Sequence, residues 1–291
     1  MDEPIIAPQG DIEAATAETQ TARPAPPGEK AETRPAQATA GETPQPGEKA
    51  VKPDIARLIL HEDNHIIVVQ KPQNVPTQGD SSGDKDFLTM IKEYVKQKYA
   101  KPGNVFIGLV HRLDRPTGGV MVFAKTDKAA ARLSEQIRDG GFKKRYFAVT
   151  VGAPRDNLGR RVSYLVKDEA NNVVREHFAA VTNSKKAELE YKLLDSATDN
   201  LSLIDVKPLT GRPHQIRVQL AGLGCPVFGD GKYGGGAAAG AGHNLALWAY
   251  ELSFSHPTQK TSMVFKCFPP EKDVPWKFFP IEKYMNIQRP R

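Results

Sequence analysis

The spacing of apolar and polar positions predicts ordered structure from about residue 55 to about residue 285. Three segments have the periodicity of helices: residues 84–99, 126–141 and 210–224. The stripe of the first helix consists of Phe87, Ile91, Tyr94, Val95 and Lys98.

Start and stop signals support the second and third helices. Thr126 can begin the second helix, and Gly140 can end it. In the third, Pro213 fits the first turn and Gly222 or Gly224 fits the end. The apolar runs outside the three predicted helices have a different pattern.

Those remaining apolar runs are short and predict strands. Residues 56–72 predict two strands around an acidic turn, and the others are residues 105–110, 120–125, 145–152, 160–168, 172–181, 187–196, 201–209, 245–254 and 263–268. Strands outnumber helices and mostly follow one another directly, which favours an α+β fold with a largely antiparallel sheet. We expect one domain over residues 51–291, because no break in composition divides it.

Residues 1–50 differ from the rest of the chain. They are rich in Ala, Pro, Thr, Gln and Glu, and the pentapeptide PGEKA occurs twice. A segment with so few apolar side chains cannot offset the entropy that ordering its backbone would cost. We therefore expect residues 1–50 to be a disordered tail. The tail carries nine acidic and four basic side chains, a net charge of −5, which leaves +11 for the other 241 residues because the whole chain carries +6.

The basic part favours a polyanionic partner, most simply nucleic acid, although many basic domains bind none. No apolar run could cross a membrane, the acidic N-terminus does not resemble a signal peptide, and the two cysteines form no pair with metal-ligand spacing. We therefore expect a cytoplasmic monomer without a metal or a cofactor.

Two glycine-containing motifs suggest other functions. GDSSG at 79–83 has the G-x-S-x-G pattern of a hydrolase, with Ser81 as the nucleophile, but it follows a loop rather than a strand. YGGGAAAGAG at 233–242 loosely resembles a phosphate-binding loop, yet it precedes a strand rather than a helix. We expect both to be surface loops.

The segment HRLDRPTGG, residues 111–119, is a stronger candidate for chemistry. Asp114 lies between Arg112 and Arg115, and Pro116 and two glycines follow in a turn between apolar runs. Such a carboxylate could be reactive or could belong to a structural ion pair, and the residues alone leave both open.

Two further segments carry candidate residues. Tyr146 begins an apolar run after three cations, Lys143, Lys144 and Arg145, and its ring could stack on a base while the cations lie near phosphate. Arg217 lies in the third predicted helix, where its guanidinium could pair with a carboxylate.

Four motifs together resemble one family. GLVHRLDRPTGGVMVFAKT, RYFAVTVG, LTGRPHQIRVQL and PVFGDGKYG, in this order and spacing, resemble the RluA-type pseudouridine synthases over about residues 55–285. The resemblance implies a mixed, mostly antiparallel, bent sheet with flanking helices and an RNA cleft. It also implies isomerisation of a uridine within rRNA or tRNA to pseudouridine, with a flipped base.

The resemblance implies roles for individual residues. Asp114 matches the catalytic aspartate, Tyr146 the tyrosine that stacks on the target base, and Arg217 the arginine that pairs with the aspartate. Arg112 matches the arginine associated with flipping. The other RNA-binding candidates are Arg115, Lys143, Lys144, Arg145, Arg212 and His214.

The chain departs from the family pattern at two positions. The early KPxG element reads KPQN, with Asn74 in place of glycine, and Trp248 stands where histidine is usual. An RNA-binding protein without catalysis and a hydrolase that uses Ser81 remain as alternatives. Whether Asp114 adds to C1′ or removes the C2′ proton stays open.

Overall fold

The computed structural model describes residues 53–197, 200–235 and 242–285, and the predicted tail at 1–50 lies outside them. The described residues form one sheet of eleven strands. The strands are β1 (Ile59–Glu62), β2 (Ile66–Lys71), β3 (Gly108–Leu109), β4 (Gly118–Ala124), β5 (Lys143–Val151), β6 (Leu158–Asp168), β7 (Val173–His177), β8 (Lys185–Ala197), β9 (Leu201–Pro208), β10 (Leu247–Ser255) and β11 (Ser262–Lys266).

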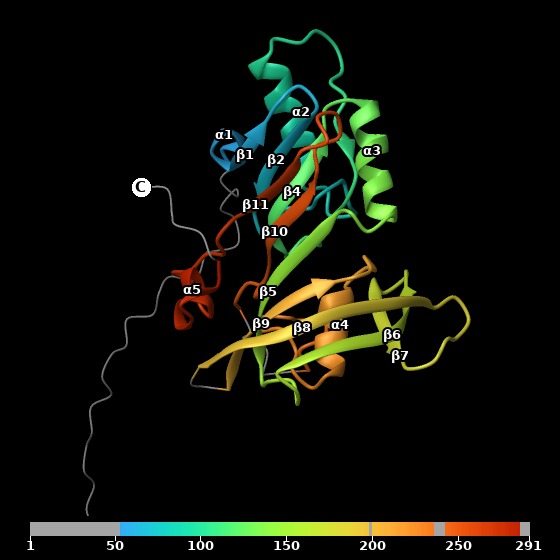
Figure 1. Ribbon diagram of the computed structural model, residues 1–291, viewed down its shortest axis with the longest axis vertical. Coiled ribbons are helices and arrows are strands. Elements are labelled where there is room, and N and C mark those ends of the chain that lie inside the picture. The colour runs from blue at the N-terminus through green and yellow to red at the C-terminus, as the bar shows by residue number, and fades with distance from the viewer. Residues whose placement is uncertain (1–52, 198–199, 236–241, 286–291) are drawn as a thin grey trace, which may run out of the picture. The chain divides into compact units, whose positions relative to one another are not determined.

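The sheet is mixed and almost entirely antiparallel, which confirms the predicted α+β fold. Its order is β1-β2-β4-β10-β5-β9-β8-β6-β7, with β11 paired to β10 and β3 paired to β4. The β4–β10 pair is the parallel one. Figure 1 shows β2, β4, β10 and β5 running steeply and β8 and β6 running nearly across them, so the sheet bends near β5.

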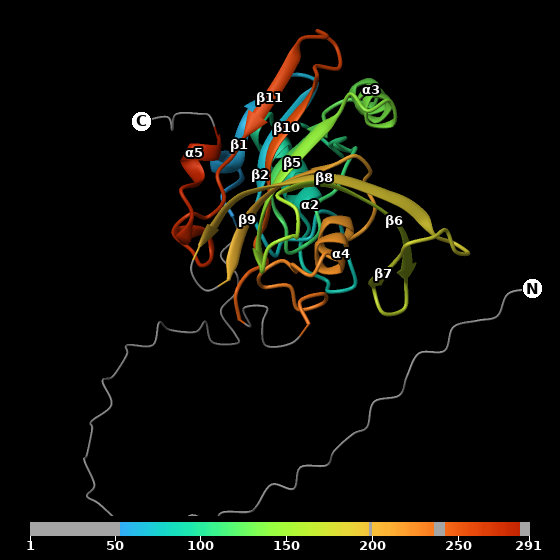
Figure 2. The ribbon, with the colours of Figure 1, turned by 60° about the horizontal axis from the view of Figure 1, so that its bottom comes forward.

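Helices lie against different parts of the sheet. α2 (Phe87–Lys98) and α3 (Asp127–Arg138) belong to the part that holds β1–β4, whereas α4 (Gln215–Gly222) packs on β6 and β7 (Figures 1 and 2). The caps explain where the predicted helices begin: Asp86 accepts from the amide of Thr89, and Thr126 accepts from the amide of Ala129.

The parallel joint between β4 and β10 depends on two glycines. Trp248 is opposite Gly118 and Ala249 is opposite Gly119. A Cβ atom on Gly118 would lie 2.2 Å from Cζ3 of Trp248, and one on Gly119 would lie 2.2 Å from the carbonyl oxygen of Ala249. The indole is buried and donates to the carbonyl of Cys267 at 3.1 Å, so Trp248 packs into the core.

Some local predictions were wrong. Residues 105–110 form only the two-residue strand β3, and Phe106 is exposed. Pro213 precedes the first turn of α4, because His214 adopts a left-handed conformation as the N-cap. The short elements α1 (Ile55–Leu58), η2 (Trp276–Phe278) and α5 (Ile281–Met285) were not predicted.

Candidate active site

The loop that carries Asp114 is held in place through its backbone. Three side chains donate to its carbonyls: Thr77 to Leu113 at 2.7 Å, Lys71 to Arg115 at 3.2 Å and Gln73 to Pro116 at 3.0 Å. A turn closes the loop, because the amide of Thr117 donates to the carbonyl of Asp114. The loop therefore presents the side chain of Asp114 from a fixed backbone.

The KPQN segment supplies two of those three donors. Lys71 is fully buried and also donates to the carbonyls of Pro72 and Val75 at 2.8 and 2.7 Å. Burial lowers the pKa of Lys71 to about 7, and the negative charge of Asp114 acts in the opposite direction. Asn74 is left-handed with φ 62° and donates to Asn244, so asparagine meets the backbone requirement of the glycine usual there.

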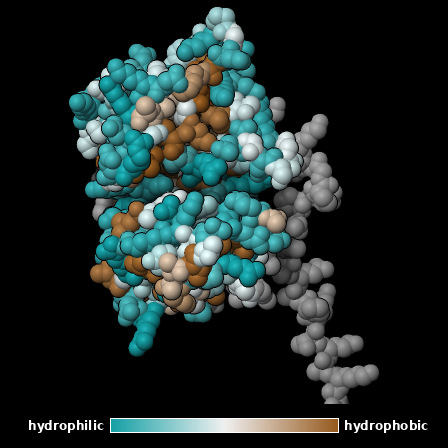
Figure 3. Space-filling view, turned by 90° about the vertical axis from the view of Figure 1, so that its right-hand side faces the viewer, coloured by the Kyte–Doolittle hydropathy of each residue, from teal (hydrophilic) through white to brown (hydrophobic). Residues whose placement is uncertain are grey.

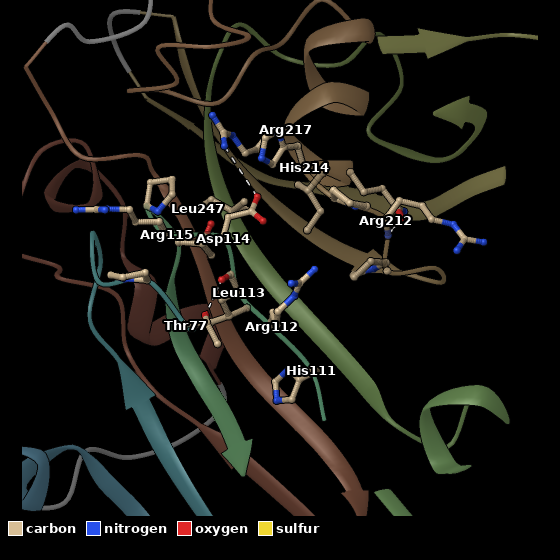
Figure 4. Close-up of a pocket in the computed structure, with 18 of the residues that line it drawn as sticks. Thr77, His111, Arg112, Leu113, Asp114, Arg115, Arg212, His214, Arg217 and Leu247 are labelled. Atoms are coloured by element: carbon tan, nitrogen blue, oxygen red, sulfur yellow. Dashed lines mark hydrogen bonds and ion pairs between the residues drawn. The ribbon is translucent and has the colours of Figure 1, made fainter. Parts of the chain in front are cut away.

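Asp114 faces a buried arginine. The Arg217 Nη1 atom lies 3.9 Å from Oδ2 of Asp114, whose side chain is 32% exposed (Figure 4). The closer partner of Arg217 is Asp230, which accepts from Nε at 2.7 Å and from Nη2 at 2.6 Å. Burial would lower the pKa of Arg217, but the bonds and charge of Asp230 raise it, so the guanidinium stays charged.

An aromatic and an aliphatic side chain lie beside the carboxylate. Tyr146 on β5 is buried, and Leu247 begins the neighbouring β10. Both contribute to the wall of the cavity that contains Asp114. Burial, followed by the charge of Asp114, raises the pKa of the Tyr146 hydroxyl, so it stays protonated at neutral pH.

The cavity has a volume of about 950 Å³ and is strongly basic. Its cations are Arg112, Arg115, Lys144, Lys167, Arg212, Arg217 and Lys232, against two carboxylates, Asp80 and Asp114. The space-filling view of the right-hand side of Figure 1 shows a hollow bordered mainly by hydrophilic residues, with a hydrophobic patch beside it (Figure 3). This charge balance suits a polyanion.

Only one of the three cations before Tyr146 reaches the cavity. Side chains alternate between the two faces of a strand, so Lys144 and Tyr146 share the cavity face, whereas Lys143 and Arg145 point away from it. Arg145 pairs with the buried Asp205, and Tyr250 donates to the same carboxylate. The structure thus does not place Lys143 or Arg145 with the other candidates.

The remaining candidates reach the cavity but differ in their partners. Arg115 donates to Ser82 at 2.8 Å and pairs with Asp80 and Asp84, and it points away from Arg217 in Figure 4. Arg112 is exposed and points toward the side where Arg212 lies. Within the described ranges, Arg112 has no hydrogen-bond or ion-pair partner, so its guanidinium is available to a ligand.

Arg212 and His214 lie just before α4. Arg212 donates to the carbonyl of Lys186 at 2.9 Å. His214 has φ 50°, and its Nδ1 lies 2.7 Å from the hydroxyl of Tyr233. Burial lowers the pKa of His214, so its imidazole is neutral at pH 7.

Comparisons with known proteins identify a family for this chain. The family model described as RNA pseudouridylate synthase matches residues 65–222. The dual-specificity RNA pseudouridine synthase RluA of Escherichia coli K12 is 34% identical over 212 residues, covering 72% of this chain and 91% of that protein. The chain belongs to the RNA pseudouridylate synthase family. The ribosomal large subunit pseudouridine synthase C of Rickettsia typhi is also 34% identical, over 186 residues and 64% of this chain.

The length of the match differs among these pseudouridylate synthases. It spans 59% of the Rickettsia typhi protein. Among solved structures, human RNA pseudouridylate synthase domain containing 4 superposes with a TM-score of 0.63 at 24% identity, covering 81% of this chain and 96% of that chain. At that identity the likeness shows the pseudouridylate synthase fold.

Sequence reasoning missed several residues of this candidate site. Asp230 and Tyr233 lie in the quoted PVFGDGKYG motif, but spacing alone does not show that Asp230 is bonded to Arg217. Leu247 looked like an ordinary strand residue. Lys71 was noted only as part of KPQN, although a lysine beside a buried strand end is a signal that could have been followed.

The alternative sites gain no support from the described residues. Ser81 lies in an exposed turn, and none of the histidines in the described ranges is bonded to it. Most of the glycine-rich segment at 233–242 lies outside the described residues. No helix within the described ranges is long and apolar enough to cross a bilayer.

The same residues contain no group of three or more side chains arranged to hold a metal ion. One histidine pair, His61 and His65, does have an H-x-x-x-H spacing, which the prediction of no metal site overlooked. The two residues lie on β1 and in the turn before β2 rather than on one helix face. The ring of His61 forms a hydrogen bond with Asp63, with Nε2 at 3.1 Å from Oδ2. Nε2 of His256 lies 2.9 Å from the same oxygen.

Proposed function

We propose that this chain isomerises a specific uridine in structured RNA to pseudouridine. The observation that carries the proposal is the meeting of Asp114, Tyr146 and Arg217 at one basic cavity. These side chains come from a loop, a strand and a helix that are far apart in sequence. An aromatic ring, an oriented carboxylate and a surplus of cations are what a flipped nucleotide requires.

The substrate base must first leave its stack, at a cost of a few kcal/mol. We assign Tyr146 to stack on the flipped uracil and Leu247 to pack beside it. Arg112 has no partner among the described residues, and we assign it to occupy the contacts that the flipped nucleotide leaves. Lys144 and Arg212 line the same cavity, and we assign them to contact phosphates around it.

The bond rearrangement rests on Asp114, and two routes use it. In one, a carboxylate oxygen bonds to C1′ as the N1–C1′ bond breaks, and it leaves when C5 attacks C1′. In the other, the carboxylate takes the C2′ proton as the same bond breaks and returns it when the C5–C1′ bond forms. In both, C5 loses a proton and N1 gains one, so the product has the composition of the substrate.

The relatives favour rRNA or tRNA as the substrate class. The Rickettsia protein is named for the large ribosomal subunit, and the Escherichia coli protein is named as dual-specific. We further propose that residues 51–291 form the catalytic domain, that residues 1–50 are a disordered tail, and that the chain acts as a cytoplasmic monomer. We assign no metal and no cofactor to the reaction.

The test is pseudouridine formation by the purified full chain in total RNA transcripts, with Asp114→Asn as the inactive variant. Asp80→Asn is the matched control, because Asp80 is the other carboxylate at the cavity and bonds to Ser82 and Arg115 instead. We expect no product from Asp114→Asn, RNA affinity within about threefold of wild type, and product from Asp80→Asn.

Two results would contradict the proposal. RNA binding by the wild type without any pseudouridine would favour the non-catalytic alternative. Turnover by Asp114→Asn within a few-fold of wild type would show that Asp114 does not take part in the chemistry.

Mapping pseudouridines in cells with and without the gene would identify the target position.

A further inference from the structure

The guanidinium of Arg217 is anchored by a carboxylate that does not line the cavity. Asp230 is fully buried, and its two oxygens accept from Nε and Nη2 of Arg217. Oδ1 of Asp230 also accepts from the amides of Lys232 and Tyr233, at 3.0 and 3.1 Å. By contrast, Asp114 is 3.9 Å from the nearest nitrogen of the same arginine.

The other surfaces of the guanidinium are also restricted. The ring of Tyr233 lies 5.1 Å from the guanidinium carbon, within cation–π distance. With the Nε–Nη2 edge bonded and one face covered, the nitrogen that remains for the cavity is Nη1. A planar fork held in this way cannot turn without breaking both bonds to Asp230.

We infer that Asp230 is a positioning residue for the proposed reaction: it directs Nη1 of Arg217 at Asp114, with the Tyr233 ring as support. The inference rests on the proposed function. Because Asp230 accepts from Nε and Nη2, the guanidinium approaches Asp114 only through Nη1, at 3.9 Å and without a hydrogen bond. Without Asp230, Arg217 is free to turn and take Asp114 into a direct two-bond pair.

The first experiment measures single-turnover pseudouridine formation at saturating RNA, together with RNA affinity and thermal melting. The variants are Asp230→Asn and the matched control Asp205→Asn, which removes another buried carboxylate bonded to an arginine, on the face of β5 away from the cavity. We expect Asp230→Asn to lose on the order of 100-fold in rate, as for a misplaced group in a site. RNA affinity stays within threefold. Asp205→Asn keeps its rate within about threefold.

The second experiment is a double-mutant cycle with Arg217→Lys. If Asp230 acts through Arg217, adding Asp230→Asn to Arg217→Lys lowers the rate by no more than about threefold further. Losses that multiply across the cycle, or equal losses in Asp230→Asn and Asp205→Asn, overturn the inference, because a general effect on folding gives those results.

Tyr233 provides a test that does not depend on the folding of Asp230→Asn. Tyr233→Phe keeps the ring over Arg217 and removes the hydroxyl that bonds to His214 and to the amide of Val174. Tyr233→Leu removes the ring. We expect a loss on the order of tenfold in rate only for the leucine variant. Equal rates for the two variants contradict the role of the ring.

A readout without turnover separates this inference from the proposed function. In ¹⁵N-arginine spectra, the bonded Nε–H of Arg217 should exchange slowly in wild type and in Asp205→Asn, and rapidly in Asp230→Asn. A wild type that makes no pseudouridine overturns the function, while these spectra still decide the anchoring. Slow exchange retained in Asp230→Asn overturns the anchoring itself.

Discussion

Replacing Gly118 by alanine should disrupt the joint on which the Asp114 loop depends. The new Cβ would lie 2.2 Å from Cζ3 of Trp248, whereas ordinary contact begins at 3.4 Å, so the indole must retreat by 1.2 Å. Such a movement breaks the 3.1 Å bond from the indole to the carbonyl of Cys267. The strand has little room to yield instead, because β4 lies so close to β10 at the next residue that a Cβ on Gly119 would be 2.2 Å from the carbonyl oxygen of Ala249.

The expected cost combines three effects. Overpacking a core costs about 1–3 kcal/mol, and the lost buried hydrogen bond adds about 1 kcal/mol. Alanine also lowers the conformational entropy of the unfolded chain, which offsets about 0.4–1 kcal/mol of this destabilisation. The free energy of unfolding should therefore fall by about 1–3.5 kcal/mol. Gly141→Ala is the matched control, because its Cβ would meet nothing closer than 3.8 Å. Only the entropy effect remains there, so its stability should rise by about 0.4–1 kcal/mol.

Urea unfolding of Gly118→Ala, Trp248→Leu and the double variant measures the effect, alongside single-turnover pseudouridine formation. A smaller side chain at 248 makes room for the methyl group, so the double variant should be more stable than the sum of the single changes by about 2 kcal/mol. A stability of Gly118→Ala within 0.5 kcal/mol of wild type, or strict additivity, would refute this account of the joint.

Three further outcomes are expected. Arg112→Ala should slow turnover strongly on a hairpin and less on an RNA whose target is already unpaired, because unstacking costs least there; equal factors on the two RNAs in single-turnover assays would argue against a flipping role. Arg217→Lys should raise the pH at which activity appears while leaving RNA binding nearly unchanged, because a lysine has one nitrogen and cannot both bond to Asp230 and face Asp114, and a pH–rate series on one RNA measures it. The pKa of Lys71 is about 7 in the folded protein, below its value in the unfolded chain, so the unfolded state binds more protons between pH 7 and 10. The stability of the wild type should therefore rise by a few kcal/mol through that window. Parallel curves of stability against pH for wild type and Lys71→Met, measured by urea unfolding, would contradict this.

Local signals predicted most of the elements because their causes are local. The helix from Asp127 to Arg138 follows from the Thr126 cap and from Gly140, which has φ 74°. Strands β5 to β9 follow from short apolar runs between turns. The alternation of side chains along β5 is equally local, so the sequence alone is enough to separate Lys144 from Arg145.

Features that depend on distant parts of the chain could not be predicted in this way. The parallel pairing of β4 with β10 is decided by packing between Gly118 and Trp248. Residues 105–110 are apolar enough for a longer strand, but only Gly108 and Leu109 pair with β4. The pairing of Arg217 with Asp230 likewise follows from their burial in the folded state, which a single sequence does not reveal.

The β4–β10 joint also has a consequence during synthesis on the ribosome. All seven residues of β4 are buried in the finished fold, and the first two, Gly118 and Gly119, pair with β10 along one edge. Leu247 is made 123 residues after Ala124, which at roughly 5–20 residues per second takes about 6–25 s. For that time the beginning of this apolar strand lacks its β10 partner in the nascent chain. The enzyme should therefore depend on ribosome-associated chaperones more than its folded surface suggests.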